Sequence, residues 1–141
     1  MKNIQKQALG VFRVLSAVYE RSPWSLEQIS ADMQQDQVDY FTIYDQEQMI
    51  GFLAIQYLLG EIEITNIAVL PTYQGQGIAS QLLKQLDSSL GPVFLEVRQS
   101  NEKAQRLYAR HGFEIVGERK EYYHNPVETA LIMKREGKND R

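Results

Sequence analysis

The chain of 141 residues contains no cysteine. Disulfides, thiolate nucleophiles and cysteine-ligated metal sites are therefore excluded. Histidine is almost as scarce, since only His111 and His124 occur, and neither stands with carboxylates at the spacing of a metal site. We therefore expect no bound metal, and we expect any group transfer to proceed without a covalent intermediate on cysteine.

Other features are missing as well. No apolar run approaches the roughly 18 residues that a membrane span needs, and the polar N-terminus does not resemble a signal peptide. The net charge of −3 argues against direct binding of nucleic acid, which requires a basic face. A mildly acidic surface suits a cationic partner such as an amine or a basic peptide. We expect one cytoplasmic domain over residues 1–135, followed by a charged and disordered tail over residues 136–141.

The segment from Asn66 to Ala79 carries the strongest local signal. An apolar strand ends at Pro71, and a loop with Gly75 and Gly77 then opens into an amphipathic helix. Such a loop directs backbone N–H groups toward one point, which is typical of a phosphate site. Alternatively, the two glycines only allow the chain to turn. The sequence has neither the Gly-Lys-Ser/Thr of a P-loop nor the third glycine and later acidic residue of a dinucleotide fold.

The remaining pattern predicts an α+β chain of alternating blocks. Two helices come first, the second one capped by Ser25 and Gln28, with Trp24 and Ile29 placed as a hydrophobic staple. A meander of short antiparallel strands follows, and then a strand–helix–strand–helix–strand–strand order. The expected later elements are strands at 40–44, 49–58, 61–70, 93–97, 113–117 and 127–134, a helix after Gly77 and a helix after Ser100 or Asn101.

A second motif reads Leu-Glu-Val-Arg-x-Ser-Asn over residues 95–101, followed by Leu-Tyr over 107–108 and Gly-Phe over 112–113. It places the carboxylate of Glu96 on a mostly apolar strand, where partial burial would make it a usable base. The hydroxyl of Tyr108 could supply a proton from the next helix. Structural alternatives exist, because Glu96 could simply pair with Arg98 and Tyr108 could be core. Asn101 could be only a helix cap.

Three further assignments stay open. Trp24 is a core anchor or a substrate contact. Tyr122 and Tyr123 are adjacent, so at most one of them faces a site. Glu61 and Glu63 rival Glu96 as the base.

The order Gln74-x-x-Gly77-x-Ala79 between a strand and a helix resembles the signature of the GNAT superfamily of acyl-CoA N-acyltransferases. The resemblance implies the GNAT fold, with a mixed, mostly antiparallel central sheet splayed between its fourth and fifth strands and helices on both faces. It implies acetyl-CoA as the acetyl donor. The backbone of Ile67, Ala68 and Val69 would pair with pantetheine, and Gly75, Gln76, Gly77, Ile78, Ala79 and Ser80 would hold the pyrophosphate.

The motif around Glu96 is similar to that of the ribosomal-protein-alanine N-acetyltransferases (RimI-type), a GNAT branch that acetylates an N-terminal alanine of a small-subunit ribosomal protein. This similarity implies Glu96 as general base, Tyr108 as general acid and Asn101 as a cofactor contact. It also implies a basic, ribosomal N-terminus as acceptor and leaves open an association with tRNA-modification factors. In one departure, Gly75 stands where close relatives often have arginine, which leaves backbone N–H groups to bind the phosphates.

The acidity of the acceptor favours an α-amino group. An α-amino group has a pKa of about 7.7–8.0, so roughly a quarter of it is neutral near pH 7.4. Only about 0.1% of a lysine side chain is neutral at that pH. This difference corresponds to about 3 kcal/mol in the free energy of deprotonation. Two alternatives stay open: acetylation of a small amine such as a polyamine or an antibiotic, and an acyl-CoA-binding module without catalysis.

Overall fold

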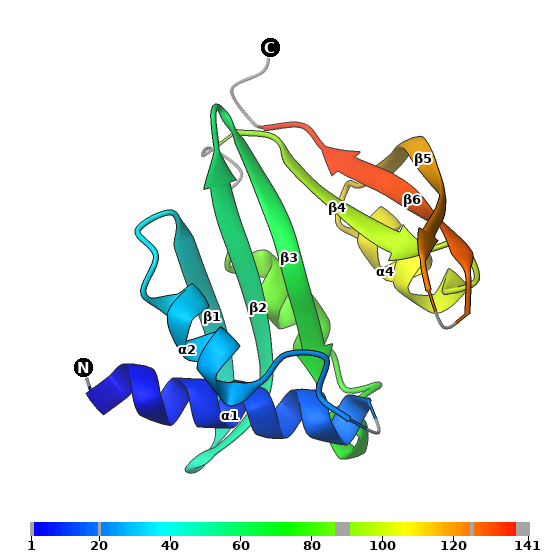
Figure 1. The fold of residues 1–141 in the computed structure, drawn as a ribbon. Coiled ribbons are helices and arrows are strands. Elements are labelled where there is room, and N and C mark those ends of the chain that lie inside the picture. Colours follow the sequence, from blue (N-terminus) through cyan, green and yellow to red (C-terminus); the bar gives the residue numbers. More distant parts are fainter. Residues whose placement is uncertain (1, 20, 87–90, 125, 138–141) are drawn as a thin grey trace. The chain divides into compact units, whose positions relative to one another are not determined.

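A computed structural model of the chain describes residues 2–19, 21–86, 91–124 and 126–137 (Figure 1). It divides into two compact units, residues 1–57 with 65–86 and residues 58–64 with 87–141. The strands form a mixed, mostly antiparallel sheet in the order β1-β2-β3-β4-β6-β5. The elements are α1 (Lys2–Val18), α2 (Leu26–Met33), β1 (Val38–Asp45), β2 (Gln48–Leu58), β3 (Glu61–Val69), the 3-10 turn η1 (Pro71–Tyr73), α3 (Ile78–Lys84), β4 (Val93–Arg98), α4 (Glu102–Arg110), β5 (Glu114–Tyr123) and β6 (Glu128–Arg135).

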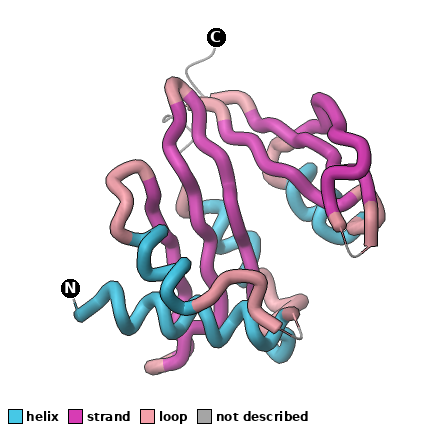
Figure 2. Tube along the Cα trace, viewed as in Figure 1, coloured by secondary structure: helices cyan, strands magenta, loops and turns pink. Residues whose placement is uncertain are grey.

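Both faces of β2 are covered in the first unit, which explains why this strand reads as a nearly continuous apolar run. Figure 2 shows α1 and α2 on one side of the strands, and α3 lies on the other. Phe52 belongs to the cluster that α1 and α2 bury. Gly51, the preceding residue, faces α3, because a Cβ built on it would lie 3.1 Å from Ile78 and 3.4 Å from Leu82. Consecutive residues of a strand point to opposite faces, so both faces need apolar side chains.

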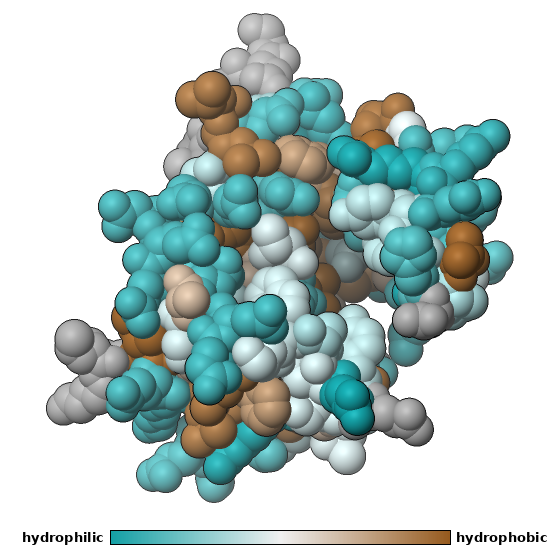
Figure 3. Space-filling model, in the orientation of Figure 1, coloured by the Kyte–Doolittle hydropathy of each residue, from teal (hydrophilic) through white to brown (hydrophobic). Residues whose placement is uncertain are grey.

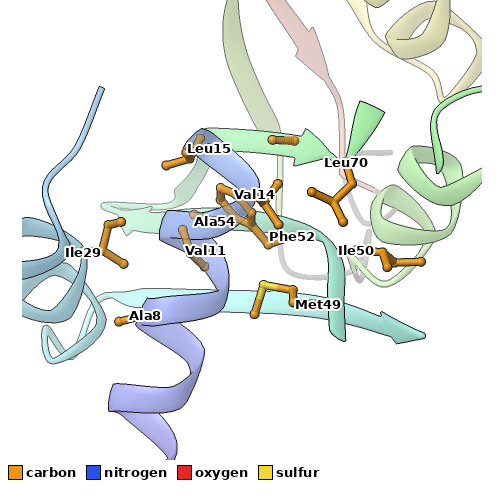
Figure 4. Close-up of a cluster of buried hydrophobic side chains, with 11 residues drawn as sticks. Ala8, Val11, Val14, Leu15, Ile29, Met49, Ile50, Phe52, Ala54 and Leu70 are labelled. Carbon is orange, nitrogen blue, oxygen red and sulfur yellow. The ribbon is translucent and has the colours of Figure 1, made fainter. Parts of the chain in front are cut away.

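The core cluster of the first unit consists of aliphatic side chains and one aromatic ring (Figure 4). Helical spacing aligns Val11, Val14 and Leu15 on one face of α1, and none of the three is exposed to solvent. Burying such side chains contributes about 1.5–3 kcal/mol each. The members are Ala8, Val11, Val14, Leu15, Ile29, Met49, Ile50, Phe52, Ala54, Ala68 and Leu70.

The start of α2 forms as the sequence predicts. The Ser25 hydroxyl accepts from the backbone N–H of Gln28 at 3.1 Å, and the Gln28 side chain accepts from the N–H of Ser25 at 2.8 Å. Ile29 is fully buried, and Trp24 packs against the same cluster. This reciprocal cap satisfies two N–H groups that a helix N-terminus leaves without partners. The capping box is confirmed.

The second unit contains the antiparallel strands β4, β6 and β5 with α4 on one face (Figure 1). Buried Val93, Leu95 and Val97 alternate along β4 with half-buried Phe94, Glu96 and Arg98. The first set faces α4, and the second set lies on the open face. The first residues of β3 join this unit through parallel pairs of Ile62 with Val93 and Glu63 with Phe94.

The predicted strand at 113–117 is too short. β5 continues to Tyr123, across the charged residues 118–121, whose composition gives no alternating pattern. Its register against β6 shifts twice, and the second shift lies between Arg119 and Tyr123. Of the predicted tail, residues 138–141 lie outside the described residues. Glu136 is exposed, and Gly137 is buried beside Gly91.

Candidate active site

The glycine loop, residues 75–77, follows Gln74 at the end of η1 and leads into α3 in the first unit. Gly75 and Gly77 both have φ of +82°, the left-handed region that costs residues with a Cβ about 1–2 kcal/mol. No heavy atom lies within 4 Å of a Cβ built on either glycine. Both positions therefore need glycine for their backbone conformation and also leave open space above the loop.

Two glutamine side chains brace this loop. Gln74 Nε2 donates to the carbonyl oxygen of Val69 at 3.0 Å, and Gln76 Nε2 donates to the carbonyl oxygen of Thr72 at 3.3 Å. The hydroxyl of Tyr73 donates to the carboxylate of Asp45. These bonds tie the loop to the end of β3 and to β1.

The other predicted donor-binding residues of this unit flank the loop. Ala68 and Val69 are buried at the end of β3, and Ile67 beside them is half-buried. Ile78, Ala79 and Ser80 form the half-buried first turn of α3, whose N-cap Gly77 provides no side-chain cap. An exposed loop of left-handed glycines with open space above it fits a diphosphate that approaches the backbone closely.

In the second unit, Glu63 and Glu96 share the open face of adjacent strands. Glu63 pairs in register with Phe94, and Glu96 lies two residues further along β4. The side chain of Glu96 is 14% exposed, and its Oε2 lies 2.6 Å from Nε of Arg119. The Tyr122 hydroxyl also hydrogen-bonds the Glu96 carboxylate. Glu63 and Glu96 are called the carboxylate pair below.

The pKa values of this cluster shift in line with those contacts. Burial raises the pKa of Glu63, the negative charge of Glu96 raises it further, and Arg119 opposes both effects. The hydrogen bond to Glu96 raises the pKa of the Tyr122 phenol, with burial as the next cause. A carboxyl group with a raised pKa is a better proton acceptor once ionised. Glu63 therefore stays a rival base.

Tyr108 lies on α4, which covers the face of the sheet opposite to Glu96. It is 7% exposed, and its ring packs on Phe113 with centroids 5.9 Å apart. Tyr108 therefore lies in the core, as the structural alternative predicts. Asn101 caps α4, because its Oδ1 accepts from the N–H of Ala104 at 3.2 Å. The cap uses only Oδ1 of the Asn101 amide, so it is compatible with a second contact through the rest of the amide group.

The ion-pair partner of Glu96 differs from the one that sequence spacing predicts. Arg98, its expected partner, instead pairs with Glu128 at 3.2 Å, while Arg119 pairs with Glu96. The cross-strand register brings Arg119 close, and no local spacing signals it. Of the rival bases, Glu61 is paired with Lys134 at 3.6 Å. Of the two adjacent tyrosines, Tyr122 contacts Glu96, whereas Tyr123 lies under Arg98.

Within the described ranges, no three His, Asp or Glu side chains gather as a metal site would require. None of the described helices combines the length and the apolar character that crossing a membrane demands. Figure 3 shows hydrophilic residues over much of the face turned to the viewer, with hydrophobic residues in separate areas.

Comparison with known proteins identifies the family. Residues 36–115 match the acetyltransferase (GNAT) domain. The ribosomal protein bS18-alanine N-acetyltransferase of Haemophilus influenzae is 36% identical, over 79% of this chain and 80% of that protein. The enzyme of the same name from Escherichia coli K12 is 37% identical over 79% of each chain.

The fold agrees with this match. The crystal structure of the ribosomal-protein-S18-alanine N-acetyltransferase from Escherichia coli superposes with a TM-score of 0.81 at 29% identity, covering 94% of this chain and 91% of that one. An acetyltransferase of the GNAT family from Streptococcus pneumoniae superposes with a TM-score of 0.76 at 18% identity, covering 94% of each chain. The chain therefore belongs to the GNAT acetyltransferase family and is an acetyl-CoA-dependent N-acetyltransferase.

Proposed function

We propose that this enzyme acetylates the N-terminal α-amino group of a small-subunit ribosomal protein that begins with alanine. The relatives named above as bS18-alanine N-acetyltransferases support this acceptor. The observation that carries the proposal is the carboxylate pair on the open face of β3 and β4, where it can receive a cationic N-terminus. A basic peptide fits a chain of net charge −3.

The reaction is a direct transfer in a ternary complex, since the chain has no cysteine to carry the acetyl group. The neutral amine attacks the thioester carbonyl, the new C–N bond forms and the C–S bond breaks. Glu96 takes the proton that the amine loses, and Tyr108 gives its hydroxyl proton to the departing thiolate.

The donor would be held mainly through backbone groups. Ile67, Ala68 and Val69 would pair with the pantetheine amides. Residues 75–80 would hold the diphosphate through their N–H groups, and Asn101 would add a side-chain contact. The open space above Gly75 and Gly77 supports this role, because any Cβ there would project into it.

Mass spectrometry of alanine-initiated ribosomal peptides tests the proposal. We expect Glu96→Gln to lower kcat/KM by about 10²–10³-fold and Tyr108→Phe by about 10²-fold, as for general base and acid groups. Glu114→Gln, at an exposed position of β5, is the charge-matched control. Full activity in both variants would overturn the two roles. A large loss in Glu63→Gln with none in Glu96→Gln would transfer the base to Glu63.

A substrate panel separates this function from acetylation of a small amine. If polyamines or amino sugars turn over well and peptides do not, the acceptor is wrong while the chemistry stands. Two further parts of the proposal are a cytoplasmic location and an association with tRNA-modification factors. Co-purification of the tagged chain tests the association, and a clean preparation without such factors would refute it.

A further inference from the structure

We propose that Arg119 occupies the position of the acceptor's ammonium group, so that the acceptor must displace Arg119 from Glu96 before it can react. Arg119 is then a positioning residue that sets the affinity for the acceptor. This inference rests on the proposed function, because it concerns the same carboxylate.

The ion pair is asymmetric in its exposure. Nε of Arg119 and Oε2 of Glu96 are 2.6 Å apart, yet the side chain of Arg119 is 58% exposed and that of Glu96 only 14%. The guanidinium is already largely hydrated and can move further into water easily, whereas the carboxylate is held on its strand. Because its cation is largely exposed, the ion pair is partly screened by solvent. The bond is therefore weak enough for another cation to replace.

The irregular end of β5 builds this arrangement. Arg119 pairs with Ala130 and Tyr123 with Glu128, so three residues of β5 lie opposite a single residue of β6. Glu121, in the middle, has a left-handed φ of +56°. In a regular strand, residues three apart point to opposite faces. The bulge instead lets Arg119 and Tyr122 reach the same carboxylate.

Arg119 also contacts the ring of Tyr122. Its guanidinium carbon lies 5.7 Å from the centre of that ring, within the range of a cation–π contact. This contact is present together with the ion pair, so it can hold the guanidinium beside the site after Glu96 is released. Displacement by the acceptor therefore costs Arg119 its ion pair and leaves its contact with the ring in place.

The charges of the cluster favour exchange. The carboxylate pair supplies two negative charges, and Arg119 supplies one positive charge. The neighbouring cations Lys134 and Arg98 are bound to Glu61 and Glu128. An arriving ammonium is attracted by the remaining negative charge but is repelled by Arg119 if both contact the same oxygen. The acceptor gains most when Arg119 leaves.

Two single variants and their double variant, which change the charges of Arg119 and Glu63, test the inference. At saturating acetyl-CoA, Arg119→Gln should lower the KM for an alanine-initiated peptide about 3–10-fold, because a competitor is removed. Glu63→Gln should raise that KM by a similar factor, and the double variant should return near wild type, since its net charge is restored. The KM for acetyl-CoA should not change in any of them. Arg119→Lys should stay near wild type.

Arg106→Gln serves as the control, because it removes one positive charge from an exposed position of α4, outside this cluster. A peptide KM that rises in Arg119→Gln would overturn the inference, since Arg119 would then hold the acceptor or the strand rather than compete. A double variant whose peptide KM stays as low as that of Arg119→Gln, or as high as that of Glu63→Gln, would also overturn it.

A second measurement does not depend on turnover. The 15Nε–H resonance of Arg119 in the wild-type protein is followed while an alanyl tripeptide amide is added. We expect it to shift and to lose protection from solvent exchange, and the N-acetylated tripeptide, which lacks the ammonium, should have no effect. An unchanged resonance at peptide saturation would refute the inference. If no peptide is acetylated but the resonance still responds to the free amine, only the proposed function fails.

Discussion

The side-chain amide of Gln74 and the carbonyl oxygen of Val69 are joined by a hydrogen bond of 3.0 Å. Val69 is the last residue of β3, and Gln74 directly precedes the glycine loop. The bond therefore sets the distance between the strand end and the loop, the two segments of the first unit that we assign to the donor.

Gln74→Ala should weaken acetyl-CoA binding without affecting the chemical step. Losing a bond of about 1 kcal/mol lets the loop move, so we expect the KM for acetyl-CoA to rise about 3–10-fold with kcat little changed. Steady-state kinetics with the acceptor at saturation measure this effect. Gln81→Ala, on the exposed side of α3, is the control. A change confined to the acceptor KM would contradict the prediction.

Gly77→Ala should destabilise the protein through its backbone alone. The φ of +82° is unfavourable for alanine, while a Cβ meets no neighbour within 4 Å. We expect a loss of about 1–2 kcal/mol in the free energy of unfolding, measured by urea denaturation. Gly117→Ala is the comparison, because its Cβ would make only ordinary contact, at 3.6 Å, with Ile132. An equal loss in both variants would show that the left-handed conformation is not the cause.

Local signals in the sequence account for much of the fold. The Ser25 and Gln28 pattern predicts the helix start correctly, because a capping box involves only neighbours along the chain. The alternation around Ile62 and Ile64 likewise predicts β3, since both are buried. The end of β5 was missed, because a bulged edge strand of charged residues has no period of two.

The site is less accessible to such reasoning. Motif similarity selects Glu96, but the contact between Glu96 and Arg119 depends on how β6 aligns β4 with β5. Arg98 stood at the spacing expected of a partner and binds Glu128 instead. Spacing of two along a strand places side chains on the same face, yet it does not decide which neighbour across the sheet is closer.

Arg98→Ala should destabilise the hairpin that joins β5 to β6. The guanidinium donates to the carbonyl oxygens of His124 and Pro126 and to Glu128, each at 3.2 Å, and it lies 4.4 Å from the centre of the Tyr123 ring. We expect a loss of about 2 kcal/mol on urea unfolding. Arg98→Lys should recover less than half of it, since an ammonium cannot reproduce the planar fork. Full recovery would show that charge alone matters.

Glu128 and Glu63 should affect the pH dependence of stability with opposite signs. The hydrogen bond from Ser100, followed by the contacts of Arg98, lowers the pKa of Glu128 below its usual 4.5. Its ionised form therefore stabilises the fold above pH 4.5, and this contribution is lost as the pH falls through the lowered pKa. For Glu63, burial and then Glu96 raise the pKa above 4.5. Its ionisation costs stability as the pH rises through the raised value.

Glutamine substitutions convert this difference into a measurement. Glu128→Gln should lower the urea midpoint at pH 7, and its deficit should shrink as the pH falls below 4.5, where the wild-type carboxyl also becomes neutral. Glu63→Gln should raise the midpoint at pH 7, and its advantage should vanish over the acidic range below the raised pKa. Glu114→Gln, at an exposed position, should follow the wild type throughout. If both substitutions lowered the midpoint at pH 7, Glu63 would be stabilised by Arg119 more than it is penalised by burial and by Glu96.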